Sequence, residues 1–232
     1  MANPGGNYPG RQIWLGSLDG KPAFAYLVTG RSDASKSRYA TPYLEDQNTI
    51  RMERVDSKEP FDIFRHYQAV RIDPKTGLLL VSNNQACVDP VFESYLCNGI
   101  RQETPAIRTE KILAAIGPEY DSKEKPTSRV IGVIMPENDD SEALLGITTQ
   151  EDSSHIFPFY PTIGTGFAFV QTYDGNVDYK NFGPEFPWSS TFDMPQVTSA
   201  GELALELYEM SDYIDIKYGD LRVCAVAGVR NG

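Results

Sequence analysis

The residues with the clearest chemical potential lie in one polar turn, Thr29–Arg38, which reads TGRSDASKSR and follows an apolar, strand-like run. The turn places Arg31 and Arg38 seven residues apart, with Lys36 and serine hydroxyls between them. Guanidinium forks and small hydroxyls bind phosphates and oxyanions, and loops at strand ends commonly carry binding groups. Charged turns are also common on solvated surfaces, so an ordinary exposed turn is the alternative interpretation.

A β-hairpin is predicted to position this turn. Two alternating apolar runs, Arg11–Leu18 and Lys21–Thr29, are separated by an Asp-Gly pair, which is a strong hairpin signal. A second hairpin is predicted from His66–Asp73 and Gly77–Ser82. The second arm of that hairpin is apolar without a break, as expected of a strand buried on both faces. The first hairpin therefore delivers the chain directly into the arginine turn.

Further strands come in blocks, with helices between them. Residues 38–49 are predicted to be irregular, and the long, aromatic, Pro-rich segment 174–196 to be an insertion or a lid. Helices are predicted at 89–99, 104–116 and 199–210, and further strands at 129–135, 143–149, 155–160, 166–173 and 221–229. Because the strands do not alternate strictly with helices, the order favours an α+β layered sandwich over a Rossmann-type sheet. We expect one domain over residues 1–232.

The bulk composition excludes several classes of partner. The formal net charge of −11 and the pI of about 4.7 argue against binding to nucleic acid or to an anionic membrane surface. A small phosphorylated ligand stays compatible, because a few arginines can make a positive pocket in an acidic protein. Neither a signal peptide nor a membrane-spanning run is predicted. Three cysteines at unpatterned spacing favour a reducing, cytoplasmic location.

Metal and nucleophile chemistry find little support in the sequence. The two histidines, His66 and His155, form no metal-ligand motif, so no metal site is predicted. Cys87 and His66 could form a nucleophilic pair, although a buried spectator cysteine is the commoner interpretation. Neither type of Gly-rich phosphate loop occurs.

Arginines, tyrosines and carboxylates at strand ends remain as candidates. Tyr67 and Arg71 share one face of a predicted strand, where an inward-facing arginine would need an anionic partner and an outward-facing one would be solvated. Asp121 lies with Glu119 and Glu124 in a charged loop, for which a solvated charge run is the alternative.

Several short motifs, which follow one another in the order found in that family, make the chain resemble the archaeal-type inosine monophosphate (IMP) cyclohydrolases. The resemblance covers most of the chain and is most specific in its first part. The motifs are Tyr8-Pro-Gly-Arg11, Gly30-Arg31-Ser32 followed by Arg38, Tyr67-x-x-x-Arg71-Ile72, Val81-Ser82-Asn83, Tyr120-Asp121 followed by Arg129, and the SEALLGIT run at Ser141–Thr148.

The resemblance implies a fold and a reaction. The fold would be a four-layer αββα sandwich like that of N-terminal-nucleophile hydrolases, without the N-terminal nucleophile. The reaction would close 5-formamidoimidazole-4-carboxamide ribotide to IMP with loss of water. Because the reacting atoms are tethered, the protein mainly orients them, removes a proton and stabilises an oxyanion. No metal or organic cofactor would be required, and the partner would be a purine nucleotide or ribotide. Whether the chain forms a homo-oligomer stays open.

The family's catalytic arginine, tyrosine and glutamate would map onto Arg38, Tyr67 and Asp121. Asp121 would take the proton from the carboxamide, while Tyr67 and Arg38 would polarise the formyl oxygen. An aspartate is shorter than the family's glutamate, so Glu119 and Glu124 stay as alternative bases. Candidates for binding phosphate, ribose and carboxamide are Arg11, Arg31, Ser32, Arg71, Asn83, Asn84 and Arg129.

Two other functions compete with the cyclohydrolase. The first is a purine-nucleotide-binding protein whose catalytic loop has degraded, which the aspartate at position 121 and the long aromatic segment favour. The second is an amide hydrolase of the N-terminal-nucleophile type, which the Met1-Ala2-Asn3 start argues against.

Overall fold

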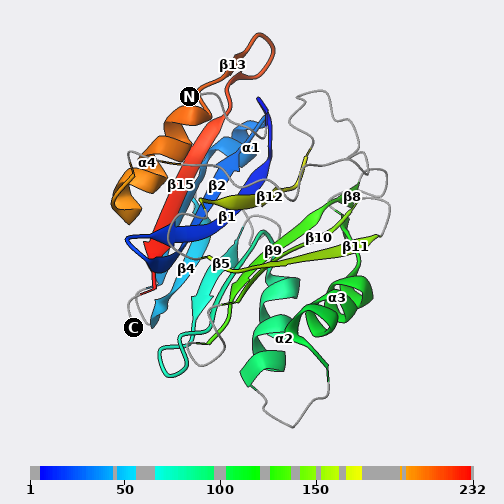
Figure 1. Cartoon of the computed structure of the whole chain (residues 1–232). Coiled ribbons are helices and arrows are strands. Elements are labelled where there is room, and N and C mark those ends of the chain that lie inside the picture. Colours follow the sequence, from blue (N-terminus) through cyan, green and yellow to red (C-terminus); the bar gives the residue numbers. More distant parts are fainter. Residues whose placement is uncertain are drawn as a thin grey trace.

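Two antiparallel sheets organise the chain in the computed structural model, which describes residues 6–43, 46–55, 66–96, 103–120, 126–136, 142–149, 153–161, 166–173, 194 and 197–230. Four strands form one sheet in the order β12-β1-β2-β15, and seven form the other in the order β11-β10-β9-β6-β5-β4-β3 (Figure 1). Four helices and two short ribbons complete the described residues. The fold is therefore mixed α+β, as the sequence predicts.

The elements have the following bounds. The four-stranded sheet contains β1 (Arg11–Leu18), β2 (Lys21–Thr29), β12 (Ala168–Gln171) and β15 (Arg222–Val229). The seven-stranded sheet contains β3 (Arg38–Tyr43), β4 (Asp46–Arg54), β5 (Tyr67–Ile72), β6 (Leu79–Ser82), β9 (Arg129–Ile134), β10 (Ala143–Thr148) and β11 (Ser154–Phe159). The ribbons are β7 (Glu119–Tyr120) with β8 (Pro126–Thr127), and β13 (Ile214–Asp215) with β14 (Gly219–Asp220). The helices are α1 (Asp33–Lys36), α2 (Gln85–Leu96), α3 (Pro105–Ile116) and α4 (Ala200–Met210).

The first hairpin has the predicted bounds and turn. Leu18 pairs with Lys21 across the two-residue loop. Asp19 and Gly20 both have positive φ, at 50° and 74°. A two-residue loop with two positive φ angles matches the twist of the strands, which explains the Asp-Gly pair. The hairpin thus fixes where β2 ends and the arginine turn begins.

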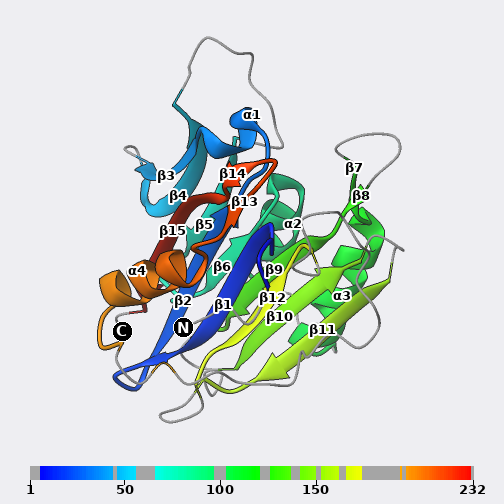
Figure 2. The same ribbon diagram turned by 90° about the horizontal axis from the view of Figure 1, so that it is seen from above.

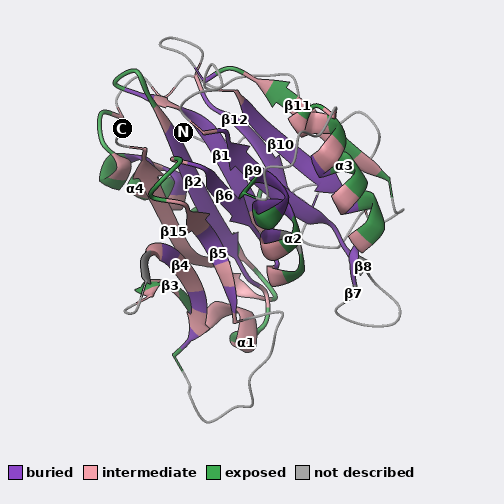
Figure 3. Cartoon of the chain, turned by 90° about the horizontal axis from the view of Figure 1, so that it is seen from below, coloured by how far each residue is buried: buried purple, intermediate pink, exposed green. Residues whose placement is uncertain are grey.

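Hydrophobic clusters lie on both faces of each sheet. Ile13 and Tyr26 of the four-stranded sheet pack with Val70 and Val81 of the seven-stranded sheet. A second cluster joins α2 and α3 to the other face of the seven-stranded sheet, and a third joins α4 to the four-stranded sheet (Figure 2). The central strands are buried along their length, which explains unbroken apolar runs such as β6 (Figure 3).

Side-chain caps account for the helix starts. The hydroxyl of Thr104 accepts from the backbone N–H of Ile107, which confirms the predicted N-cap of α3. Ser199 begins α4 with a complete capping box, also as predicted. Helix α2 begins earlier than the predicted 89–99, because Asn84 Oδ1 caps it by accepting from the Ala86 N–H at 2.7 Å.

One segment predicted to be irregular is a hairpin. Residues 38–49 contain β3 and the start of β4, which pair at the edge of the seven-stranded sheet. Pro42 hides this pattern from the sequence, yet an edge strand tolerates proline because one side of its backbone has no strand partner. The predicted lid, 174–196, lies outside the described residues except for Met194. Among the described helices, none has the length and apolarity needed to cross a membrane.

Candidate active site

A polar cavity of about 150 Å³ opens where β1 begins and β2 ends. The described residues of its walls contribute hydroxyls, aromatic rings and guanidinium groups, and none of them has an aliphatic side chain. They are formed by Tyr8, Gly10, Arg11, Thr29, Arg31, Ser32, Ser35, Arg38 and Tyr173. Three arginines therefore face one cavity in a chain whose formal net charge is −11.

The arginine turn is ordered by hydrogen bonds and is not a freely solvated loop. Ser32 Oγ accepts from the N–H of Ser35, and the Gly30 N–H donates to Leu221 O at 2.8 Å. Arg38 is 5% exposed, and its Nε donates to Ser35 O at 2.9 Å. These contacts fix the turn against β15 and place Arg38 in the cavity wall.

Aromatic rings hold Arg31 at the rim of the cavity. Its guanidinium carbon lies 4.9 Å from the ring centre of Tyr8 and 5.8 Å from that of Tyr218. Tyr8 in turn stacks on Tyr173, with ring centres 5.3 Å apart. Rings next to the guanidinium face leave the in-plane N–H groups oriented for an anion. The stack therefore restricts the orientation of the Arg31 guanidinium.

Arg11 of the cavity wall interacts electrostatically with the buried Glu119. Arg11 lines the cavity, and no described residue accepts a hydrogen bond from its buried Nε. Burial opposes the charge of Arg11, but Glu119 and several tyrosines hold its pKa well above the ordinary value. Glu119 is 1% exposed. Glu119, the predicted alternative base, thus acts electrostatically on a residue of the cavity wall.

Tyr67 is buried and does not line the cavity. Its phenol oxygen is 2.6 Å from that of Tyr26. The same phenol helps to raise the pKa of Arg11. Of the three predicted catalytic residues, Arg38 lines the cavity, and Tyr67 acts electrostatically on Arg11 of its wall. Asp121 lies outside the described residues, as does the alternative base Glu124.

Two predicted binding residues contact helices instead. Arg71 Nη1 lies 2.9 Å from Asp89 Oδ1 of α2, which gives this arginine the anionic partner that an inward orientation requires. Arg129 Nε donates to Gly117 O at 2.6 Å, at the C-terminal end of α3. A cation at the C-terminal end of a helix satisfies a terminal carbonyl and interacts favourably with the helix dipole. Neither side chain lines the cavity described above.

The two predicted amides also contact the backbone. Asn83 Nδ2 donates to Ser128 O, and its Oδ1 accepts from the Val130 N–H, so this side chain joins the end of β6 to β9. Asn84 caps α2, as described above. Both amides are buried and lie outside the cavity lining.

Several residues of the site were not predicted from the sequence. Tyr173 and Tyr218 follow no motif that marks them as binding residues, and the β13–β14 ribbon that carries the second of them was not predicted. Tyr26 could have been found, because alternation along β2 places its side chain on the buried face between the sheets. Ser35 belongs to the singled-out turn but was given no role of its own.

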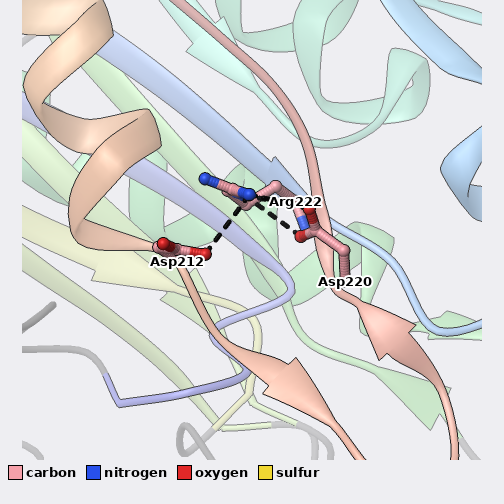
Figure 4. A network of polar contacts seen from close by, with 3 residues as sticks. All are labelled: Asp212, Asp220 and Arg222. Atoms are coloured by element: carbon pink, nitrogen blue, oxygen red, sulfur yellow. Dashed lines mark hydrogen bonds and ion pairs between the residues drawn. The ribbon is translucent and has the colours of Figure 1, made fainter.

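A network of ion pairs anchors the β13–β14 ribbon. The guanidinium of Arg222 lies 3.2 Å from Asp212 Oδ1 and 2.8 Å from Asp220 Oδ2, so it joins the end of α4 to β14 (Figure 4). Lys36 of α1 also holds the ribbon, because its Nζ donates to the backbone oxygen of Tyr218. The network therefore holds the ribbon that presents Tyr218 to Arg31.

We expect Arg222→Met to raise KM about threefold and leave kcat unchanged, because the charges are exposed and the network acts only through Tyr218. Steady-state kinetics on the substrate proposed below measures this. Lys111→Met is the matched control, because it removes the Lys111–Glu103 pair on α3, away from the cavity. An Arg222→Met enzyme with unchanged KM would show that the ribbon does not need this anchor.

Comparison with known proteins bears directly on this site. Among the described residues, no group of three or more side chains is arranged to hold a metal ion. No curated protein matches the chain at a significant level. A protein-family model described as IMP cyclohydrolase-like protein matches residues 8–231, which is nearly the whole sequence and includes every residue of the cavity. The chain therefore belongs to the IMP cyclohydrolase-like protein family.

Proposed function

We propose that this protein closes 5-formamidoimidazole-4-carboxamide ribotide to IMP with loss of water. The observation that carries the proposal is that Arg11, Arg31 and Arg38 line one polar cavity in an acidic chain of this family. A cavity with three cations and several hydroxyls suits a phosphorylated ligand. The substrate is a small anion, so the overall negative charge does not oppose it once the local field is positive.

Arg31 and Ser32 bind the phosphate in this proposal. The stacked rings orient the Arg31 guanidinium, and the Ser32 hydroxyl lies on the same turn. Arg38 and Tyr67 polarise the formyl oxygen as charge develops there. These groups are fixed before the substrate arrives, which is what electrostatic stabilisation of a transition state requires.

Glu119 is our proposed base, with Asp121 as the alternative. The resemblance implies a glutamate in this role, and Glu119 is buried beside Arg11 of the cavity wall. It would take one proton from the carboxamide nitrogen as that nitrogen bonds to the formyl carbon, and return it to the formyl oxygen. The formamide N–H then gives up its hydrogen as the new C=N bond forms and the C–O bond breaks, which supplies the second hydrogen of the departing water. The proposal uses neither Arg71 nor Arg129, whose guanidinium groups contact α2 and α3.

The packing order supports a proposal about the fold as well. One helix cluster covers the outer face of each sheet, and the two sheets share the cluster between them. We propose that this order is the four-layer αββα sandwich of N-terminal-nucleophile hydrolases, within one domain spanning residues 1–232.

Replacing Arg31 with methionine tests the phosphate site. We expect the Kd for IMP and the KM for the ribotide to rise about 10- to 100-fold, because a charge-assisted contact contributes about 1.5–3 kcal/mol. Affinity for inosine, which lacks the phosphate, should change less than threefold. Isothermal titration and the ultraviolet absorbance of ring closure measure these values.

Arg51→Met is the matched control, because Arg51 also stacks on a tyrosine ring but lies outside the cavity. An equal loss of IMP and inosine affinity in the Arg31→Met protein would contradict the phosphate assignment. Tight IMP binding by the unaltered protein, with no absorbance change from the ribotide, would instead select the degraded nucleotide-binding protein.

A further inference from the structure

The phenols of Tyr26 and Tyr67 form a hydrogen-bonded pair between the two sheets. Tyr26 is fully buried on β2, Tyr67 is 3% exposed on β5, and their oxygens are 2.6 Å apart. A buried phenol needs a hydrogen-bond partner, whereas a phenylalanine would fill the same space without a polar group to satisfy. The pair therefore calls for an explanation beyond packing.

Either phenol could donate this hydrogen bond, and the direction decides what Tyr67 can do. Burial, followed by the neighbouring Tyr67, raises the pKa of Tyr26 well above its ordinary value, whereas Arg11 and Arg38 lower it. Tyr26 is therefore a neutral phenol with one O–H, which can donate to the oxygen of Tyr67. Because a phenol has one hydrogen, a Tyr67 that accepts from Tyr26 retains its own hydrogen for another acceptor.

We infer that Tyr26 is a positioning residue that acts through Tyr67, orienting its hydroxyl towards the formyl oxygen of the substrate. This inference rests on the proposed function. A chain of hydrogen bonds polarises each member, so Tyr26 makes Tyr67 a stronger donor when charge builds on the formyl oxygen. The effect is largest in the transition state, where that charge is greatest.

Tyr26→Phe removes the hydroxyl and retains the ring. We expect kcat to fall roughly 3- to 10-fold, the effect of about one neutral hydrogen bond, with KM changed less than twofold. Affinity for IMP should be unchanged, because the formyl oxygen has left as water and the product has no acceptor at that position. A packing defect would alter IMP affinity and kcat together.

A double-mutant cycle tests whether Tyr26 acts through Tyr67. In a Tyr67→Phe background, the further change Tyr26→Phe should lower kcat by less than twofold, because its partner is already absent. Full additivity of the two losses would overturn the inference. So would a Tyr26→Phe enzyme with unchanged kcat.

Tyr95→Phe is the matched control. Tyr95 is also a buried tyrosine whose phenol oxygen lies 2.6 Å from a hydroxyl, that of Thr109, but it belongs to the α2–α3 layer. The Tyr95→Phe protein should lose about as much stability as the Tyr26→Phe protein and should retain full activity. If the unaltered protein itself fails to close the ring, the proposed function fails; if it turns over and Tyr26→Phe matches it, only the present inference fails.

Discussion

Glu119→Gln should lower kcat for ring closure by about 10²- to 10⁴-fold, the range found when a general base is removed. The substitution preserves shape and removes the charge. Glu119 is the buried carboxylate that raises the pKa of Arg11, and Arg11 lines the cavity. Following the absorbance change of ring closure at saturating ribotide measures kcat directly.

Three comparisons make this result decisive. Asp121→Asn should retain most of the activity if Glu119 is the base, and the opposite pattern would return the role to Asp121. Glu53→Gln is the control, because Glu53 accepts a hydrogen bond from Tyr39 and neither residue lines the cavity. This substitution should leave kcat unchanged. IMP affinity within about tenfold of the unaltered protein would show that the Glu119→Gln cavity remains formed. Near-normal kcat in that variant would contradict the assignment.

The parts of this fold that sequence could predict are those with local causes. The Asp-Gly turn, the Thr104 and Ser199 caps and the alternation of the strands depend on residues close in the chain, and the structure has each of them. The start of α2 was missed because Asn84 is equally typical of a strand end and a helix cap. Strand β3 was missed because proline marks a break everywhere except at an edge.

The site was predicted in part for the same reason. Arg31, Ser32 and Arg38 belong to one turn, and Arg11 begins the strand that pairs with β2, so local order brings them together. Tyr173 and Tyr218 reach the site from distant segments, and their positions depend on sheet order that one sequence does not reveal. Arg71 and Arg129 looked like ligand groups because sequence spacing cannot show that Asp89 or a helix end already contacts them.

Gly10 contacts both the end of β2 and the segment that carries Tyr173. Of the substitutions proposed, Gly10→Ala should therefore cause the largest loss of stability. Its φ is +73°, and a Cβ there would lie within 3.0 Å of the Thr172 hydroxyl and the Tyr173 ring. Its N–H donates to Thr29 Oγ1, and its carbonyl accepts from the Thr29 N–H. The backbone therefore cannot move away from the clash without breaking its contacts with the end of β2.

We expect Gly10→Ala to lower the free energy of unfolding by about 2–6 kcal/mol, the sum of left-handed backbone strain and steric overlap. Chemical denaturation measures this. Displacement of Tyr173 would also disturb the ring that stacks on Tyr8 and, through it, Arg31, so affinity for IMP should fall in the protein that still folds. Gly201→Ala is the control: this exposed glycine of α4 has nothing within 4 Å of a Cβ, and alanine should stabilise the helix by up to about 1 kcal/mol. Equal stabilities for the two variants would mean that the close approach of Gly10 to Thr172 and Tyr173 does not constrain the chain. The position of the stacked Tyr8 and Tyr173 rings would then need another explanation.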